Sequence, residues 1–178
     1  MRYICLLRGI NVGAKNRIKM DALRESFSVS GFSNPQTYIQ SGNVVFDSDE
    51  ASEQVLCERL VTMLQKHFGY AVPVMLRKLS EFELLIAQQP FQGAAFDPAC
   101  MHVVFLSAEL ATDSTQKLEG LPAAPDLCRL GYREAYLYCP QGYARTVYSN
   151  QFFESCFGLQ ATTRNWKTVC AIYKMLQS

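Results

Sequence analysis

Only two histidines, His67 and His102, occur among the 178 residues, and neither belongs to a recognisable catalytic or metal-binding motif. The seven cysteines include no C-x-x-C pair, so the sequence has the spacing of neither a zinc site nor a disulfide framework. No residue pair stands out as a catalytic acid and base. We therefore expect no metal and no cofactor, and the sequence assigns no reaction.

Long apolar runs and a strong net charge are also missing. No stretch approaches the roughly 20 apolar residues that cross a bilayer, and because Arg8 interrupts the first apolar run we expect no signal peptide. These absences predict a cytoplasmic protein with reduced, mostly buried thiols and no membrane partner. The net charge of +1 argues against bulk nucleic-acid binding, and 49% hydrophobic residues suffice for a core.

Acidic residues are absent from both ends of the chain. Residues 1–20 contain five cations and no acid, and the chain after Glu154 contains three cations and no acid. If the two ends meet in space, they form a local positive patch.

The spacing of apolar residues in the first half predicts the order β-α-β-β-α-β, which is the ferredoxin-like plan. Gly31 is placed to end the first helix, and Ser52 and Gly69 to begin and end the second. Ser80-x-x-Glu83 is a capping box that predicts a connecting helix. The expected strands are 3–7, 37–40, 43–46 and 72–76, and Pro73 suggests an edge position for the last.

The second half repeats this order in part. We expect strands at 102–106, 127–130 and 134–139, helices at 112–118 and after Ser149, and a last helix from about 164 to 176 in place of a strand. The predicted fold is α+β. It has two ferredoxin-like-related βαββα units, residues 1–90 and 91–178, with antiparallel sheets, helices on one face and an extra C-terminal helix.

The loop at residues 8–19 is the strongest candidate site. Gly9 and Gly13 permit close backbone approach, and Lys15 and Arg17 add positive charge just before a helix, where anions are favoured. The glycines are one residue too close together for a P-loop, and Asn16 stands where that motif needs a hydroxyl. A generic anion cradle remains, with a solvated basic turn as the alternative.

Two further segments join this prediction. A tight hairpin turn accounts for the presence of Ser41 and Asn43, but their side chains could also orient a ligand. Thr162 and Thr163 suit the start of a helix, where the cations that follow are unfavourable unless an anion is bound. The predicted ligand-binding residues are Arg8, Gly9, Asn11, Gly13, Lys15, Arg17, Ser41, Asn43, Arg164, Asn165 and Lys167.

Three blocks of the sequence together resemble the signature blocks of the bacterial Domain of Unknown Function 1697 family: residues 7–13 with Lys15 and Met20, residues 38–46, and residues 162–169. The resemblance extends over essentially the whole chain in the same order. It implies an α+β fold of two ferredoxin-like-related units, and it implies no activity.

We therefore expect a binding module or enzyme for a small phosphorylated or carboxylated ligand, in a composite basic site built from both halves. One alternative is a nucleic-acid-associated protein that uses the same cations as a phosphate track, which predicts a continuous basic stripe. Another is an interaction module for an acidic protein partner, which predicts an exposed apolar patch beside the cations. The glycines favour the first, because a stripe or an interface needs charge but no glycine.

Overall fold

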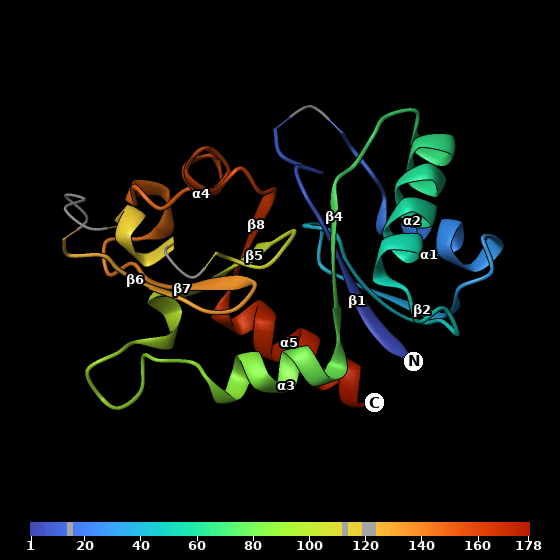
Figure 1. Cartoon of the computed structure of the whole chain (residues 1–178). Coiled ribbons are helices and arrows are strands. Elements are labelled where there is room, and N and C mark those ends of the chain that lie inside the picture. Colours follow the sequence, from blue (N-terminus) through green and yellow to red (C-terminus); the bar gives the residue numbers. More distant parts are fainter. Residues whose placement is uncertain (14–15, 112–113, 119–123) are drawn as a thin grey trace. The chain divides into compact units, whose positions relative to one another are not determined.

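The computed structural model describes residues 1–13, 16–111, 114–118 and 124–178 (Figure 1). They form two compact units: one comprises Met1–Glu83 together with Ile172–Ser178, and the other comprises Leu84–Ala171. Each unit contains a four-stranded antiparallel sheet, and the predicted α+β fold is confirmed. No helix in the described part of the chain is both long and apolar enough to span a membrane.

The first unit follows the predicted β-α-β-β-α-β order. Its sheet has the strand order β2-β3-β1-β4, which places β4 at an edge as Pro73 predicts. Helices α1 and α2 cover one face of this sheet (Figure 1), where Cys5, Leu23 and Leu60 are completely buried. The elements are β1 (Arg2–Leu7), α1 (Met20–Val29), β2 (Ser33–Tyr38), β3 (Asn43–Asp47), α2 (Glu53–Phe68) and β4 (Val74–Lys78).

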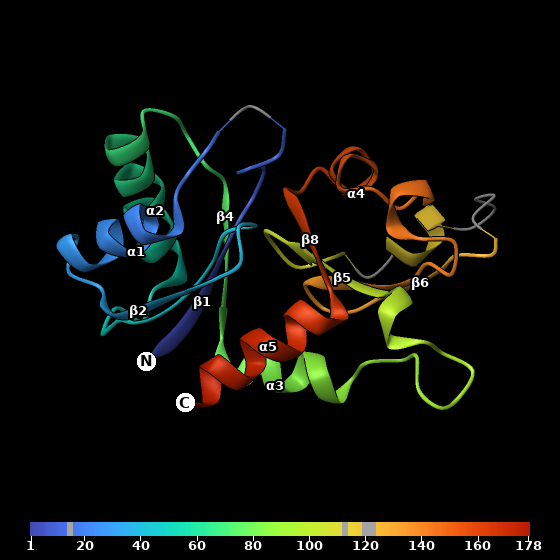
Figure 2. The ribbon, with the colours of Figure 1, turned by 180° about the vertical axis from the view of Figure 1, so that it is seen from behind.

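The second unit repeats the topology, with the strand order β6-β7-β5-β8. Helix α4 lies over one face of its sheet, as the opposite view also shows (Figure 2), and Phe153 packs there against Val104 and Leu137. The elements are β5 (Met101–Leu106), β6 (Leu127–Leu130), β7 (Glu134–Tyr138), α4 (Asn150–Phe157) and β8 (Ala161–Asn165). Two further helices, α3 (Leu79–Ala87) and α5 (Trp166–Gln177), each contribute residues to both units.

Helix caps account for much of the agreement between sequence and structure. The hydroxyl of Ser52 accepts a hydrogen bond from the Val55 N–H at the start of α2, and left-handed Gly69 ends that helix. Ser149 and Gly158 begin and end α4 in the same way. Both cap pairs are confirmed. They are predictable from the sequence because a cap depends on residues that are close together in the chain.

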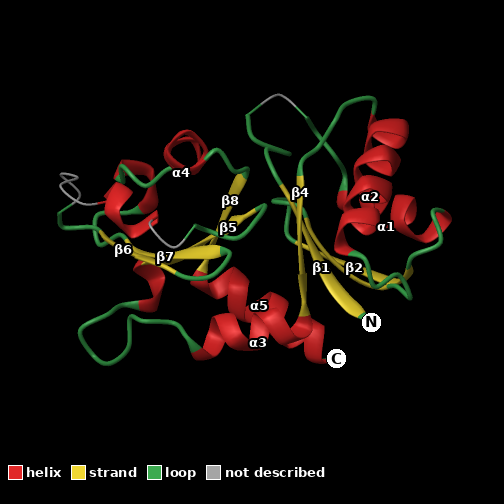
Figure 3. Ribbon diagram, viewed as in Figure 1, coloured by secondary structure: helices red, strands yellow, loops and turns green. Residues whose placement is uncertain are grey.

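Four predicted elements differ in the structure. The strand expected at 37–40 is β2 over Ser33–Tyr38, and Ile39 and Gln40 lie in the turn that follows it. The expected helix start at 162–164 is wrong: these residues form β8, which completes the second sheet (Figure 3). The capping box at Ser80 is also wrong, because α3 begins at Leu79 and the Glu81 carboxylate accepts from the Lys78 N–H at 2.7 Å. The expected helix at 112–118 is a 3₁₀ helix over Ser114–Leu118, and residues 112–113 lie outside the described residues.

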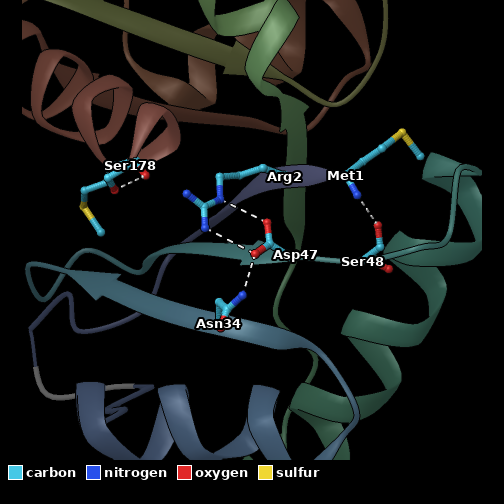
Figure 4. Close-up of polar contacts among 7 residues, drawn as sticks. Met1, Arg2, Asn34, Asp47, Ser48 and Ser178 are labelled. Atoms are coloured by element: carbon cyan, nitrogen blue, oxygen red, sulfur yellow. Dashed lines mark hydrogen bonds and ion pairs between the residues drawn. The ribbon is translucent and has the colours of Figure 1, made fainter.

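The N-terminal strand is tied to β3 by an ion pair (Figure 4). The Arg2 guanidinium donates to both carboxylate oxygens of Asp47, with the closer pair of atoms 3.0 Å apart. Asn34 donates to the same carboxylate at 2.8 Å. The hydrogen bond from Arg2 is the main reason that the pKa of Asp47 is lowered from its usual value.

This lowered pKa makes the contribution of Asp47 to stability depend on pH. The contribution is present above the unfolded-state pKa of about 4 and is lost as the pH falls through the lower folded-state pKa. We expect Asp47→Asn to reduce the free energy of unfolding by about 1 kcal/mol at neutral pH, since the pair is partly exposed. Urea denaturation near pH 7 and near pH 3 tests this; an equal deficit at both pH values would contradict it.

Candidate functional site

The loop between β1 and α1 takes an unusual backbone path. Gly9, Asn11 and Gly13 have positive φ angles of 70°, 55° and 62°, and the residues between them do not. Glycine adopts this region freely, and asparagine tolerates it better than most side chains. The two glycines are therefore required by the loop itself. Lys15, the cation predicted to face the anion, lies outside the described residues.

The side chain of Asn11 fixes the shape of this loop. Its amide nitrogen donates to the carbonyl oxygens of Ile18 and Gln40, at 2.9 and 2.8 Å. Its amide oxygen accepts from the Ile18 N–H at 2.8 Å. Asn11 thus joins the first part of the loop to the approach to α1 and to the β2–β3 hairpin, and we assign it a structural role in the loop.

Gly42 makes the second connection between the loop and the hairpin. Its carbonyl oxygen accepts from the Leu7 N–H at 2.8 Å. It is buried and has no room for a side chain, because an added Cβ would lie 2.6 Å from Ile10 Cδ1. The loop and the hairpin turn of the first unit therefore form one packed structure, and the predicted proximity of residues 8–19 to residues 41–43 is observed.

The two predicted hairpin residues, Ser41 and Asn43, are half-buried and buried respectively. Asn43 is 1% exposed, and its amide nitrogen donates to the Tyr38 carbonyl and the Ser41 hydroxyl. These bonds hold the turn, as the hairpin interpretation of the segment expects. Arg8 is half-buried, and its backbone N–H donates to the Pro73 carbonyl at 2.9 Å.

A pocket of about 660 Å³ opens beside the loop, at the start of α1. Its lining combines residues from the loop, the helix and the hairpin. The polar and glycine residues of the lining are Asn11, Gly13, Arg17, Lys19, Asp21 and Gln40, and Ile18 and Met20 supply its apolar part. Three of the predicted site residues, Asn11, Gly13 and Arg17, therefore lie around one pocket in the first unit.

The charges around this pocket favour an anion. Arg17 and Lys19 are exposed, so both can turn toward a ligand. The one acid of the lining, Asp21, already pairs with Arg24 at 2.9 Å. The side chain of the N-cap residue Lys19 makes no capping hydrogen bond, and the first N–H groups of the helix add partial positive charge next to the two cations.

Sequence reasoning missed the part of the hairpin that borders the pocket. Gln40 lines the pocket, and its neighbour Ile39 is 47% exposed with a φ of 47°. A β-branched residue in the left-handed region is a rare and strained conformation. The sequence does not indicate the left-handed conformation of Ile39, because Thr37-Tyr38-Ile39-Gln40 has the composition of an ordinary strand.

The remaining predicted site residues belong to the second unit. Arg164 is 6% exposed within β8, and its guanidinium donates to the Thr162 hydroxyl at 2.8 Å. Asn165 follows it, and its amide oxygen accepts from the Thr168 N–H at 2.8 Å, which caps the start of α5. Lys167 is exposed in the first turn of α5. A contribution of these three residues to anion binding stays a prediction.

Neither histidine is among the described residues that line this pocket. His67 is exposed on α2, and His102 is half-buried on β5, where its ring stacks on Tyr143 with 4.9 Å between centroids. Burial lowers the pKa of His102 below its usual value, so the ring is neutral at neutral pH. Within the described residues, no three His, Cys, Asp or Glu side chains are grouped to hold a metal ion.

Comparisons with known proteins identify relatives whose descriptions name no activity. A sequence model of the family described as "Protein of unknown function (DUF1697)" matches residues 1–136. The solved structure of the conserved bacterial protein SP0830 from Streptococcus pneumoniae is similar, with a TM-score of 0.77 and 29% sequence identity. That similarity covers 98% of each chain. No curated protein matches this sequence.

Proposed function

We propose that this chain, which belongs to the DUF1697 family of proteins of unknown function, binds a small phosphorylated or carboxylated ligand. The observation that carries the proposal is the pocket of about 660 Å³ at the uncapped start of α1, with Arg17 and Lys19 in its lining. A helix N-terminus with adjacent cations is suited to a phosphate or carboxylate group.

The arrangement of the cations favours a pocket over the two alternatives. A phosphate track for nucleic acid needs charges spread along a surface, whereas Arg17 and Lys19 border one concavity with Gln40 and Asn11. An interface for an acidic protein needs an apolar patch beside the charges, and Val12 and Ile39 are the exposed large apolar residues of the loop and the hairpin turn. The exposed side chain of Gln40 also offers an amide group that can bind the uncharged part of a ligand.

Isothermal titration of the full chain with inorganic phosphate, pyrophosphate and citrate tests the proposal. We expect at least one of these anions to bind, about tenfold more weakly to Arg17→Ala or Lys19→Ala and about a hundredfold more weakly to the double variant. Lys66→Ala removes an exposed cation of α2 that does not line the pocket, and it is the matched control.

Several outcomes separate the candidate functions. Equal affinity of the wild type and the double variant would contradict the pocket, as would binding that Lys66→Ala weakens equally. Binding of a single-stranded oligonucleotide but not of the small anions, with a steep loss in salt, would favour the phosphate track. Lys167→Ala in the same titration tests the predicted contribution of the second unit.

A further inference from the structure

Two cysteines of the second unit adjoin the paired ends of β5 and β7. The register of the two strands ends at Met101 and Tyr138, and Cys100 and Cys139 are the residues next to this pair, just outside the strands. The Cys139 N–H donates to the Cys100 carbonyl at 2.8 Å, so the backbone pairing continues through this position. Directly opposed residues of antiparallel strands place their side chains on the same face.

The expected separation suits a disulfide. Hydrogen-bonded antiparallel partners have Cα atoms about 5.5 Å apart, within the range of about 4.4 to 6.8 Å found for bridged cysteines. Here one of the two bonds of such a pair is formed, since the Cys100 N–H donates to the Asp97 carbonyl at 3.0 Å. Both thiols are free in this structure. Burial raises the pKa of the Cys139 thiol to about 11, and Asp126 and Cys100 make smaller contributions in the same direction.

The two thiols differ in exposure. Cys139 is completely buried and hydrogen-bonded to Thr146, whereas Cys100 is half-buried at the end of a short 3₁₀ helix, Pro98–Cys100. A reagent from solvent therefore reaches Cys100 first, and Cys139 is positioned behind it as a second thiol.

A third cysteine on the same sheet does not fit as the partner. Cys128 of β6 pairs with Leu137, so it lies diagonally from Cys139. Diagonal neighbours are about 7 to 8 Å apart, which is beyond the reach of a disulfide without backbone movement. This diagonal spacing disfavours Cys128 as the partner, although Cys128 and Cys139 belong to the same buried cluster.

We propose that Cys100 and Cys139 form a peroxide-oxidisable dithiol that closes to a reversible disulfide between β5 and β7. The Cys100 sulfur, as its thiolate, attacks a peroxide oxygen: an S–O bond forms, the O–O bond breaks, and the leaving oxygen takes a proton to become water or an alcohol. The Cys139 sulfur then attacks the resulting sulfenic acid. The S–S bond forms, the S–O bond breaks, and hydroxide leaves with the Cys139 proton as water. The two thiols together lose two electrons to the peroxide.

Peptide mapping of the full chain after treatment with hydrogen peroxide tests this proposal. We expect a Cys100–Cys139 cross-linked peptide, a mass decrease of about 2 Da for the closed pair, and full reversal by dithiothreitol. Because the bond closes a long loop, the oxidised protein is expected to melt on the order of 10 °C higher than the reduced protein.

Two alanine variants distinguish the proposed pair from general cysteine oxidation. Cys128→Ala keeps both proposed partners, so we expect the same cross-link. Cys100→Ala removes the accessible thiol without altering the buried one, so we expect no mass decrease and no rise in melting temperature. The proposal is overturned if Cys100 is trapped only as a sulfenic acid, or if Cys139 cross-links to Cys128.

Discussion

Gly42→Ala is expected to reduce the free energy of unfolding by about 3 kcal/mol, combining backbone strain of about 1–2 kcal/mol with overpacking of similar size. Gly42 has a φ of 77°, which an alanine adopts only at a cost. The added methyl group would also lie 2.8 Å from Leu7 Cβ and 2.6 Å from Ile10 Cδ1. Leu7 is in the central part of the sheet, so the conflict forces the loop and the hairpin apart.

Gly69→Ala is the matched control for this substitution. Gly69 has a nearly equal φ of 83°, but nothing lies within 4 Å of an added Cβ. The control therefore measures the backbone cost alone, which we expect to be about 1 kcal/mol. Urea denaturation of both variants gives the comparison. Equal losses would mean that Gly42 is needed only for its φ angle and that the loop does not pack tightly on the hairpin.

Asn11→Ala is expected to have an effect of similar size, a loss of about 3 kcal/mol in the free energy of unfolding. Alanine removes all three hydrogen bonds of the side chain and is strained at a φ of 55°. Asn11→Gly loses the same bonds without the strain, so we expect a smaller loss of about 2 kcal/mol.

Anion titration of the two Asn11 variants separates stability from binding. If Asn11 shapes the pocket, both variants bind phosphate about tenfold more weakly than wild type although neither changes a charge. Unchanged affinity would show that the pocket does not depend on the Asn11 connection. A stability loss in Asn11→Gly as large as that in Asn11→Ala would mean that the hydrogen bonds, and not the backbone angle, account for the cost.

The sequence predicts the elements whose signals are local. Ser52, Gly69, Ser149 and Gly158 mark helix ends because each acts on residues three or four positions away. The strand β8 is missed because Thr-Thr-Arg-Asn is polar and directly precedes a helix, so it has the composition of a cap. Its pairing with β5, about 60 residues earlier, is a tertiary contact that no local pattern encodes.

The candidate site shows the same limit. The positions of Gly9 and Gly13 correctly locate a tight loop, since a positive φ is a local demand on residue type. The role of Asn11 depends on the Gln40 carbonyl, 29 residues away, and so on the register of the hairpin. Lys19 and Gln40 line one pocket because the folded chain brings the start of α1 next to the hairpin turn. This proximity is also a tertiary contact that no local pattern encodes.

A titration of isotopically labelled full chain with inorganic phosphate, followed by the backbone amide resonances, tests the central claim most directly. We expect the largest shifts at Arg17, Lys19, Met20 and Asp21, where the pocket meets the first N–H groups of α1. These shifts should saturate together and disappear in the Arg17→Ala, Lys19→Ala double variant. Saturable shifts confined to other parts of the chain, or shifts near α1 that persist in the double variant, would contradict an anion site at this pocket.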